Sequence, residues 1–404
     1  MIWALCNLES LAADGPYSFV GGPFGSKLTT RDYVDEGVPV IRGSNLGNGR
    51  FLDTTNFVYV TESKVREDLF GSLAMPRDLV FTQRGTLGQV ALVPEDGPSD
   101  RYVVSQSQMK MTVDETKADR LFLYYYFTSS EAVQRIHSFV SSSGVPHINL
   151  SVLRNFEVPK PPLKTQQAIA SILSTYDDLI ENNRRRIQLL EQAARLLYKE
   201  WFVHMRFPGH EHVRIKGGVP EGWEKCQLHR IADITMGQSP RSKFYNEDGT
   251  GLPFHQGVTN FGVRFPTHNI YCTLESRMAE PSDILFSVRA PVGRLNITLD
   301  RIVIGRGLAA IRSNCDRQNF LFFCLKSHFF KEDMIGGGAI FAAITKNDLY
   351  NVELLQPPNQ LMEMFTEHVR PIDKQIETLH KASINMSKAR DLLLPRLMNG
   401  EIAV

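Results

Sequence analysis

The sequence predicts an α+β protein in which two mixed α/β domains are separated by two long antiparallel helices that form a coiled coil. Three observations predict this architecture. One helical stretch carries a seam of apolar residues, that seam occurs a second time, and short motifs outside the helices also occur twice in the same order. The chain therefore has the pattern of a duplicated domain-plus-helix unit, which suggests a pseudo-twofold arrangement.

The first predicted helix runs from Leu163 to His204 and contains no Pro or Gly. Its seam alternates spacings of four and three residues, a mean period of 3.5 that is typical of one helix packed lengthwise on another. The polar exception in the seam is Asn183, and a lone Asn in such a seam can fix its register. An ordinary long core helix is the alternative interpretation. The seam positions are Ile169, Leu173, Tyr176, Ile180, Asn183, Ile187, Leu190, Ala194, Leu197 and Trp201.

The second copy of the seam lies about 196 residues further along the chain. Both copies follow a pair of prolines, which disfavours helix immediately before them. Pro371 lies inside the second copy, so we expect a short helix before it, a fresh start there, and a bend near Thr175 in the first copy. We expect the two long helices to pack against each other. The second set of positions is Phe365, Val369, Ile372, Ile376, Leu379, Ser383, Met386, Arg390, Leu393 and Leu397.

The composition is that of a globular protein, with 404 residues, 42% of them hydrophobic and 22% charged. No apolar run approaches the roughly 18 residues of a membrane span, and the first ten residues do not resemble a signal peptide. We therefore expect a cytoplasmic protein with no membrane partner. The five cysteines include no C-x-x-C, which argues against disulfides and a zinc ribbon. A net charge of +1 neither requires nor excludes a nucleic acid.

The duplication extends into the domains, because short motifs return in the same order while their offset falls steadily. Ordered repetition with a falling offset indicates shorter connecting loops in the second copy. We place the first domain at 1–160, a central helical region at 161–207, the second domain at 208–355 and a C-terminal helical region at 356–404. The motif pairs begin at Trp3 and Trp223, Ser26 and Ser242, Gly37 and Gly251, Pro76 and Pro281, and Arg84 and Arg289.

The first domain reads as short strands with peripheral helices. We expect strands at 38–41, 57–60, 79–82, 89–93 and 109–113. A helix is expected at 121–138, with its aromatic residues in the core, and its counterpart in the second domain at 320–331.

Polar side chains between these strands are of the types that read base edges in DNA. Arg pairs bidentately with guanine, and Asn or Gln pairs with adenine. A local excess of basic residues between 237 and 312 suits phosphate contacts. For each residue taken singly, a solvated loop side chain is the alternative. The predicted DNA-binding residues are Arg42, Asn45, Arg50, Gln83, Arg84, Gln89, Gln106, His255, Gln256, Arg264, Arg289, Arg294 and Arg306.

Among these, Arg84 and Arg289 share one setting: each follows a strand ending in Phe and precedes a Gly by four residues. We predict that both lie in loops that approach DNA. The alternative is a structural arginine paired with a carboxylate of its own domain.

Catalytic motifs are missing from the sequence. It contains no G-x-x-x-x-G-K-[ST], G-x-S-x-G or H-E-x-x-H, and no N-P-P-aromatic or D-P-P-aromatic loop of the kind expected in an adenine methyltransferase. The histidines at 204, 210 and 212 have no recognised metal-ligand spacing. We predict no catalytic residue, no metal site and no cofactor.

The order of domain, P-P-x-x-x-Q helix, domain and helix, with D-[LI]-[VL]-F-x-x-R-[GA]-x-x-G in both domains, resembles the specificity subunit of type I restriction–modification systems. The resemblance covers essentially the whole chain. It implies two target-recognition domains, each reading one half of a split, asymmetric site in double-stranded DNA. It also implies a non-catalytic subunit that joins two methyltransferase subunits and restriction subunits. One departure is Asn359-Gln360-Leu361 after the second proline pair, in place of the usual L-x-x-Q.

Three alternatives belong to other classes. The chain could be the specificity subunit of a related phage-defence system with a different modifying partner, a single-chain DNA methyltransferase or nuclease, or a coiled-coil scaffold that does not bind DNA.

Overall fold

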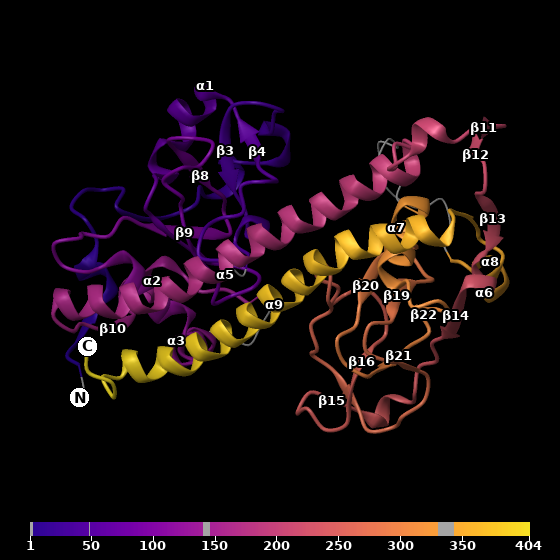
Figure 1. Ribbon diagram of the computed structural model, residues 1–404. Helices are drawn as coiled ribbons and strands as arrows, with labels where there is room; N and C mark the ends of the chain where they lie inside the picture. The colour runs from indigo at the N-terminus through magenta and orange to yellow at the C-terminus, as the bar shows by residue number, and fades with distance from the viewer. Residues whose placement is uncertain (1–2, 48, 140–145, 330–342) are drawn as a thin grey trace. The chain divides into compact units, whose positions relative to one another are not determined.

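The computed structural model describes residues 3–47, 49–139, 146–329 and 343–404 (Figure 1). The chain divides into two compact units: unit 1 is Met1–Asn183 with Lys381–Val404, and unit 2 is Arg184–His380. Helices α5 (Leu163–Tyr198) and α9 (Asn359–Met398) each contribute to both units. The boundaries at 160, 207 and 355 stay a prediction, because each compact unit includes parts of both helices as well as a domain.

Unit 1 contains two four-stranded sheets. The first sheet is antiparallel, and the second contains one parallel pair, β3 and β8, with Val40 opposite Val103. The first sheet has the order β2 (Phe19–Gly21), β9 (Gln108–Met111), β6 (Leu79–Thr82), β7 (Val90–Leu92). The second has the order β4 (Val58–Val60), β3 (Val38–Ile41), β8 (Tyr102–Val104), β5 (Leu73–Ala74), and a separate pair joins β1 (Leu5–Asn7) to β10 (Glu157–Pro159).

Unit 2 repeats this arrangement, with one parallel pair, β16 and β21, that sets Phe254 opposite Val303. Its antiparallel sheet has the order β14 (Ala232–Met236), β22 (Leu308–Ser313), β19 (Ile284–Ser287), β20 (Leu295–Ile297). Its mixed sheet has the order β15 (Tyr245–Asn246), β17 (Tyr271–Cys272), β16 (Leu252–His255), β21 (Ile302–Ile304), β18 (Met278–Ala279), and β13 (Glu224–Gln227) pairs with β23 (Glu353–Gln356). Apart from the additional strand β15, the strand orders of the two units are equivalent, which confirms the duplication that the motif order predicted.

The predicted strands are all present, and those at 38–41 and 79–82 have the bounds of β3 and β6. The predicted helix at 121–138 is two helices, α2 (Arg120–Thr128) and α3 (Ser130–Ser138). Ser129 divides them, because its hydroxyl accepts the N–H of Ala132 and so caps α3. The aromatic side chains of α2 are buried, as predicted.

The counterpart of this helix in unit 2 is α7 (Gln318–Phe329), and the predicted residues 330 and 331 lie outside the described part of the chain. Besides short 3-10 and π-helical turns, the remaining short helices and strands are α1 (Glu62–Lys64), α4 (Leu150–Arg154), α6 (Leu228–Ile231), α8 (Lys346–Tyr350), β11 (Ile215–Lys216) and β12 (Val219–Pro220).

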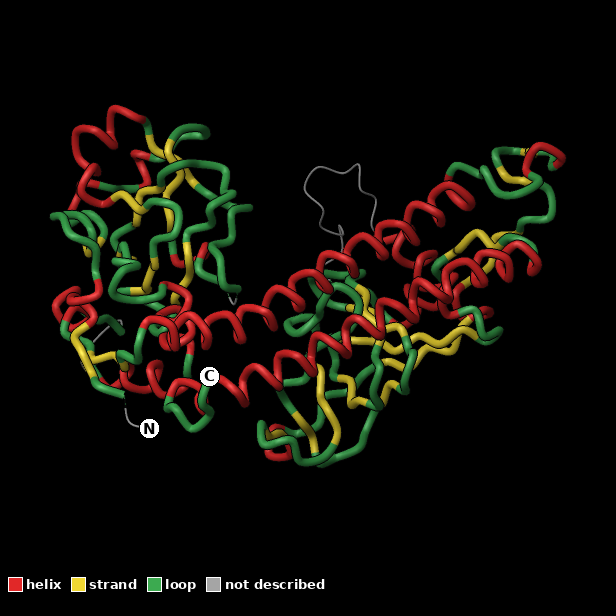
Figure 2. Tube along the Cα trace, turned by 60° about the vertical axis from the view of Figure 1, so that its left-hand side comes forward, coloured by secondary structure: helices red, strands yellow, loops and turns green. Residues whose placement is uncertain are grey.

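Within unit 1 the start of α5 packs against the end of α9, which Figure 1 labels and which Figure 2 shows near the marked C-terminus. Ile169 lies in one core cluster with Leu397. Further along α5, Asp177 binds Arg390, and the Asn183 amide donates to the Ser383 hydroxyl at 3.3 Å. Residue numbers rise along α5 as they fall along α9, which confirms the predicted direction.

Within unit 2 the second part of α5 meets the first part of α9 in the same way. Ile187 shares a cluster with Ile376 and Leu379, and the rings of Trp201 and Phe365 lie 6.1 Å apart. Every seam position predicted on the two helices is buried or half-buried. The period of 3.5 therefore identified the contact face correctly in both units.

Pro371 does not break the second helix, so the expected short preceding helix was wrong. Helix α9 is continuous from Asn359 to Met398. Pro371 lacks the N–H that would bond the carbonyl of Glu367, but both residues are exposed, so water can satisfy that carbonyl. Buried Val369 and Ile376 hold the helix on either side of the proline. Helix α5 is continuous through Thr175, and the bend expected there stays a prediction.

Within the described residues, no helix combines the length and apolar character that a membrane crossing requires.

Candidate nucleic-acid interface

In unit 1 four loops meet at one edge of the two sheets. They are residues 22–28, 42–47, 83–89 and 105–107, which follow β2, β3, β6 and β8, and we call them edge 1. Because β3 and β8 are parallel, their carboxyl ends reach the same side of the sheet, and Ser105 N–H donates to Ile41 O at 3.0 Å. The other two loops join through Gln83 N–H to Ser107 O at 2.7 Å and Gly22 N–H to Gln108 O at 2.9 Å.

Edge 1 brings together five of the predicted residues: Arg42, Gln83, Arg84, Gln89 and Gln106. Three of them also hold the loops in place through hydrogen bonds from their side chains to backbone carbonyls. The amide nitrogen of Gln89 donates to Leu46 O at 2.8 Å, that of Gln106 donates to the carbonyls of Gly25 and Leu28, and Arg42 donates to Asn56 O at 3.0 Å.

Arg84 is exposed, and no ion pair to it is seen in the described part of the chain. The alternative prediction, a structural arginine paired with a carboxylate of its own domain, therefore has no support for Arg84 among the described residues.

Unit 2 has an equivalent edge 2, formed by residues 237–241, 256–260, 288–294 and 305–307 after β14, β16, β19 and β21. The same kind of bonds join its loops: Gly305 N–H to His255 O at 2.8 Å, and Val288 N–H to Gly307 O at 2.9 Å. Its exposed side chains include four predicted residues, Gln256, Arg289, Arg294 and Arg306.

The two edges place different side chains at equivalent positions. The paired strands β3–β8 and β16–β21 align Arg42 with Gln256 and Gln106 with Arg306. Arg84 and Arg289 are equivalent too, because each residue forms an antiparallel backbone bridge, to His147 and Ala343 respectively.

The glycine four residues after each of these arginines has the same backbone conformation in both units. Gly88 and Gly293 have φ values of +86° and +85°, a conformation that glycine adopts without steric cost.

Two predicted residues lie inside the domains rather than at their edges. Asn45 is 1% exposed, and its side chain accepts Arg42 N–H at 2.9 Å and donates to Asp53 O at 3.0 Å, so it shapes the loop that carries Arg42. His255 is 3% exposed and hydrogen-bonded to His268 at 2.8 Å. This placement gives both residues structural roles, which spacing along the sequence could not distinguish from base contacts.

Arg50 and Arg264 connect a domain to the long helices, so this structure does not place them where DNA could be read. They are equivalent, because their carbonyls accept the N–H groups of Leu92 and Ile297 at 2.9 and 2.8 Å. Arg50 binds Asp178 on α5. Arg264 is 3% exposed. Its guanidinium forms ion pairs with Glu191 and Asp373 and stacks over the Phe322 ring, 4.2 Å from the ring centroid. Lys326 completes the cluster by pairing with Glu191.

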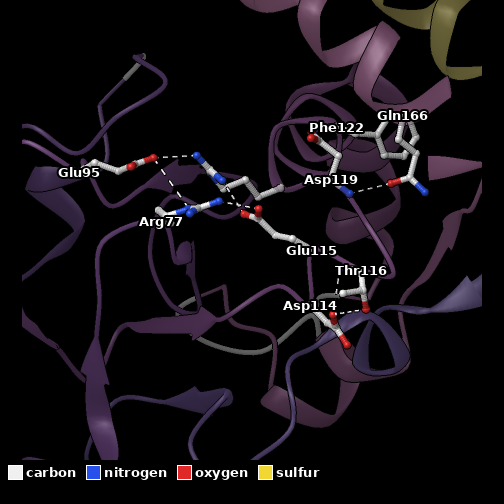
Figure 3. Close-up of polar contacts among 9 residues, drawn as sticks. Arg77, Glu95, Asp114, Glu115, Thr116, Asp119, Phe122 and Gln166 are labelled. Atoms are coloured by element: carbon white, nitrogen blue, oxygen red, sulfur yellow. Dashed lines mark hydrogen bonds and ion pairs between the residues drawn. The ribbon is translucent and has the colours of Figure 1, made fainter. Parts of the chain in front are cut away.

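The motif glutamine at the start of α5, Gln166, also attaches a domain to a helix (Figure 3). Its Oε1 accepts the N–H of Asp119 at 2.9 Å, and Asp119 in turn caps α2 through Phe122 N–H at 2.9 Å. Its amide nitrogen donates to Pro161 O at 2.8 Å. The P-P-x-x-x-Q spacing therefore serves packing: it places a buried amide between α5 and α2.

In unit 2, where the sequence departs from this motif, the attachment differs. Met362 stands where unit 1 has Gln166, and Arg317 reaches α9 instead, binding Asn359 and, at 2.7 Å, Glu363.

The buried histidine predicts an acid-sensitive unit 2. Burial lowers the pKa of His255 to about 4, and the nearby His268, itself 3.1 Å from Asp300, adds to this effect. The unfolded chain then binds more protons than the folded one between pH 6.5 and 4, so stability falls as the pH is lowered through this range. The slope is up to about 1.4 kcal/mol per pH unit.

Urea unfolding of the His255→Gln variant at pH 7 and pH 5 is expected to show a smaller acid loss than the wild type. His212→Gln, at a side chain that is 84% exposed, is the matched control. An unchanged acid loss in His255→Gln would contradict a neutral, buried His255.

Comparisons with known proteins agree with this architecture. The family described as "Type I restriction modification DNA specificity domain" matches residues 25–192. The chain is 32% identical over 391 residues to a putative type I restriction enzyme MjaX specificity subunit from Methanocaldococcus jannaschii, covering 93% of this chain and 90% of the relative. It is 24% identical over 392 residues to the MjaIX specificity subunit of the same organism, covering 93% and 89%.

The chain therefore belongs to the specificity subunits of type I restriction enzymes, as the resemblance predicted. Among solved structures it is similar to the type I restriction–modification S subunit from M. genitalium, with a TM-score of 0.54, 16% identity, and coverage of 98% of this chain and 96% of that one. That likeness supports the fold.

Proposed function

We propose that this protein reads a split, asymmetric site in double-stranded DNA, with edge 1 reading one half-site and edge 2 the other. The observation that carries the proposal is the repetition of one edge on one strand order, with different side chains at equivalent positions, such as the exposed Gln106 and Arg306. Shared architecture supports a shared task. Different side chains support different targets.

The side-chain chemistry supports the asymmetry. Arg42 of edge 1 occupies the position that Gln256 has in edge 2, and Gln106 of edge 1 occupies the position that Arg306 has in edge 2. Arg favours guanine, and Gln favours adenine or, like Gln106, donates hydrogen bonds to the carbonyls of a neighbouring loop. Two half-sites read by such edges should differ in sequence.

We also propose that the subunit is non-catalytic and positions two methyltransferase subunits and restriction subunits on the DNA. Its relatives are named as specificity subunits, which does not favour a single-chain methyltransferase or nuclease. In unit 2, Leu189 and Leu196 of α5 and Val203 of the π-helical turn that follows it (Lys199–Val203) lie at intervals of seven residues and are 65%, 48% and 45% exposed. An apolar stripe of this kind supports docking of a partner on the outer face of the helix. Action in the cytoplasm is part of the same proposal.

Separate alanine substitutions of Arg84 and Arg289 test the division of reading between the edges. A base-reading arginine changed to Ala should cost about 1–3 kcal/mol and relax one position of one half-site. A phosphate-binding arginine would instead weaken binding to all sequences alike and reduce the salt dependence. The measurement is the affinity of the complex with methyltransferase subunits for single-base variants of the target, at two salt concentrations.

Arg77→Ala and Arg301→Ala are the matched controls, since both side chains are exposed and ion-paired within their own units. They should leave the base preferences unchanged. If Arg84→Ala or Arg289→Ala altered both half-sites equally without unfolding the protein, the two edges would not be independent readers.

A further inference from the structure

Phe24 is the most exposed large hydrophobic side chain among the described residues, at 85%. It lies in the loop 22–28 of edge 1, between Gly22-Pro23 and Gly25-Ser26-Lys27. Exposed apolar side chains are common, but one this exposed at the centre of a polar loop cluster calls for a physical reason.

The loop that carries Phe24 is held at both ends. Gly22 N–H donates to Gln108 O at 2.9 Å, and a Cβ at Gly22 would overlap the backbone of Ser105, so only glycine permits this approach. On the other side of Phe24, the amide of Gln106 donates to Gly25 O and, at 3.3 Å, to Leu28 O. The backbone on both sides of Phe24 is therefore fixed while its ring remains in solvent.

The surroundings of the ring favour a nucleic acid. Lys27, three residues away, is exposed, and so is Gln106 on the loop bonded to this one. Arg84 is exposed on the next loop, which is bonded to Ser107. A cation beside an apolar ring suits a phosphate next to a base edge. In the major groove, the apolar group that a base presents is the 5-methyl of thymine, which Phe contacts in protein–DNA complexes.

We propose that Phe24 reads a thymine in the half-site of unit 1 through the 5-methyl group. This inference rests on the proposed function and names one of its contacts. It is confined to unit 1, because the Ser26-Lys27 motif aligns with Ser242-Lys243, and Pro240 then stands at the position of Phe24. The half-site of unit 1 should therefore contain at least one A·T pair.

Deoxyuridine differs from thymidine only by the missing methyl, which makes it the direct probe. Each thymine of the mapped target is replaced singly by deoxyuridine, and the affinity of the complex with methyltransferase subunits is measured. One replacement, in the half-site of unit 1, is expected to weaken wild-type binding about four-fold, the value of one buried methyl group. In Phe24→Ala the same replacement should have no effect, whereas Phe24→Leu should retain part of it.

Phe70→Ala is the matched control: its ring is 58% exposed in the same unit and contacts Tyr17 at 5.7 Å rather than edge 1. It should retain the wild-type response to deoxyuridine. Specific binding with no response to deoxyuridine at any position, or with a response that persists in Phe24→Ala, would overturn the inference and leave the proposed function standing. If Phe24→Ala lowered the affinity equally for every sequence, Phe24 would contact DNA without reading a base, and the inference would also be overturned. Absence of any sequence-specific binding by the wild type would instead overturn the proposed function.

Discussion

Replacing Arg264 by alanine is expected to destabilise unit 2 by about 3–5 kcal/mol, the cost typical of breaking a buried ion pair. Arg264 neutralises two carboxylates from two different helices, Glu191 on α5 and Asp373 on α9, the latter at 3.1 Å. Burial raises the pKa of Asp373, and the Arg264 cation opposes that shift. Without the guanidinium, the buried Glu191 and the half-buried Asp373 lose their shared partner, with Lys326 at 3.6 Å from Glu191 as the nearby cation.

The measurement is urea unfolding followed by tryptophan fluorescence in a Trp3→Phe background, where Trp201 and Trp223, both in unit 2, report. Arg301→Ala is the control, because Arg301 is 45% exposed and pairs with Glu280 at the surface, where such pairs contribute about 0–1 kcal/mol. Glu191→Gln combined with Asp373→Asn should recover part of the Arg264→Ala loss. An Arg264→Ala loss as small as that of Arg301→Ala would contradict a buried cluster.

The long helices were the part of the fold that local patterns predicted best. A seam with a period of 3.5 defines one face of a helix wherever that helix lies, and Ile169, Ile187 and Ile376 are buried as that face requires. The order of the repeated motifs predicted the second domain, because duplicated strands reproduce a strand order. These patterns depend on residues close in sequence or on copies of them.

The failures arose where tertiary contacts overrule local preference. A proline usually ends a helix, but Pro371 faces solvent and its neighbours are held by packing. Ser129 was expected inside a helix and instead caps the second of two. Both outcomes depend on what the rest of the fold places around the residue.

In the candidate interface, the sequence predicted the kinds of side chain at the two edges better than it predicted which individual residues lie there. Arg84 and Gln106 lie at edge 1, Arg289 and Arg306 lie at edge 2, and their contacts with DNA stay a prediction. Arg50 and Arg264 were indistinguishable from them in sequence, because nothing local reveals that each binds a carboxylate more than a hundred residues away, Asp178 and Asp373 respectively. Phe24 was not among the predicted residues, because those were chosen as side chains that can hydrogen-bond to base edges. The glycines on either side of it, Gly22 and Gly25, were the signal in the sequence that this loop is tightly held.

Scrambling one half-site of the target is expected to lower affinity by about 10²–10³-fold, roughly half of the specific free energy typical of a DNA-reading protein. Two readers on one chain bind jointly, so loss of one leaves only the contacts of the other. Changing the bases between the half-sites at constant length should have almost no effect, and this duplex is the control. An equal loss for spacer and half-site changes would contradict two separate edges.

The target itself is the most direct test of the central claim. The protein is combined with its methyltransferase subunits, genomic DNA is modified, and the methylated positions are mapped by sequencing. The account predicts two short specified segments of different sequence separated by unspecified bases, with Arg84→Ala relaxing one segment and Arg289→Ala the other. A single continuous segment, or two identical segments, would contradict it.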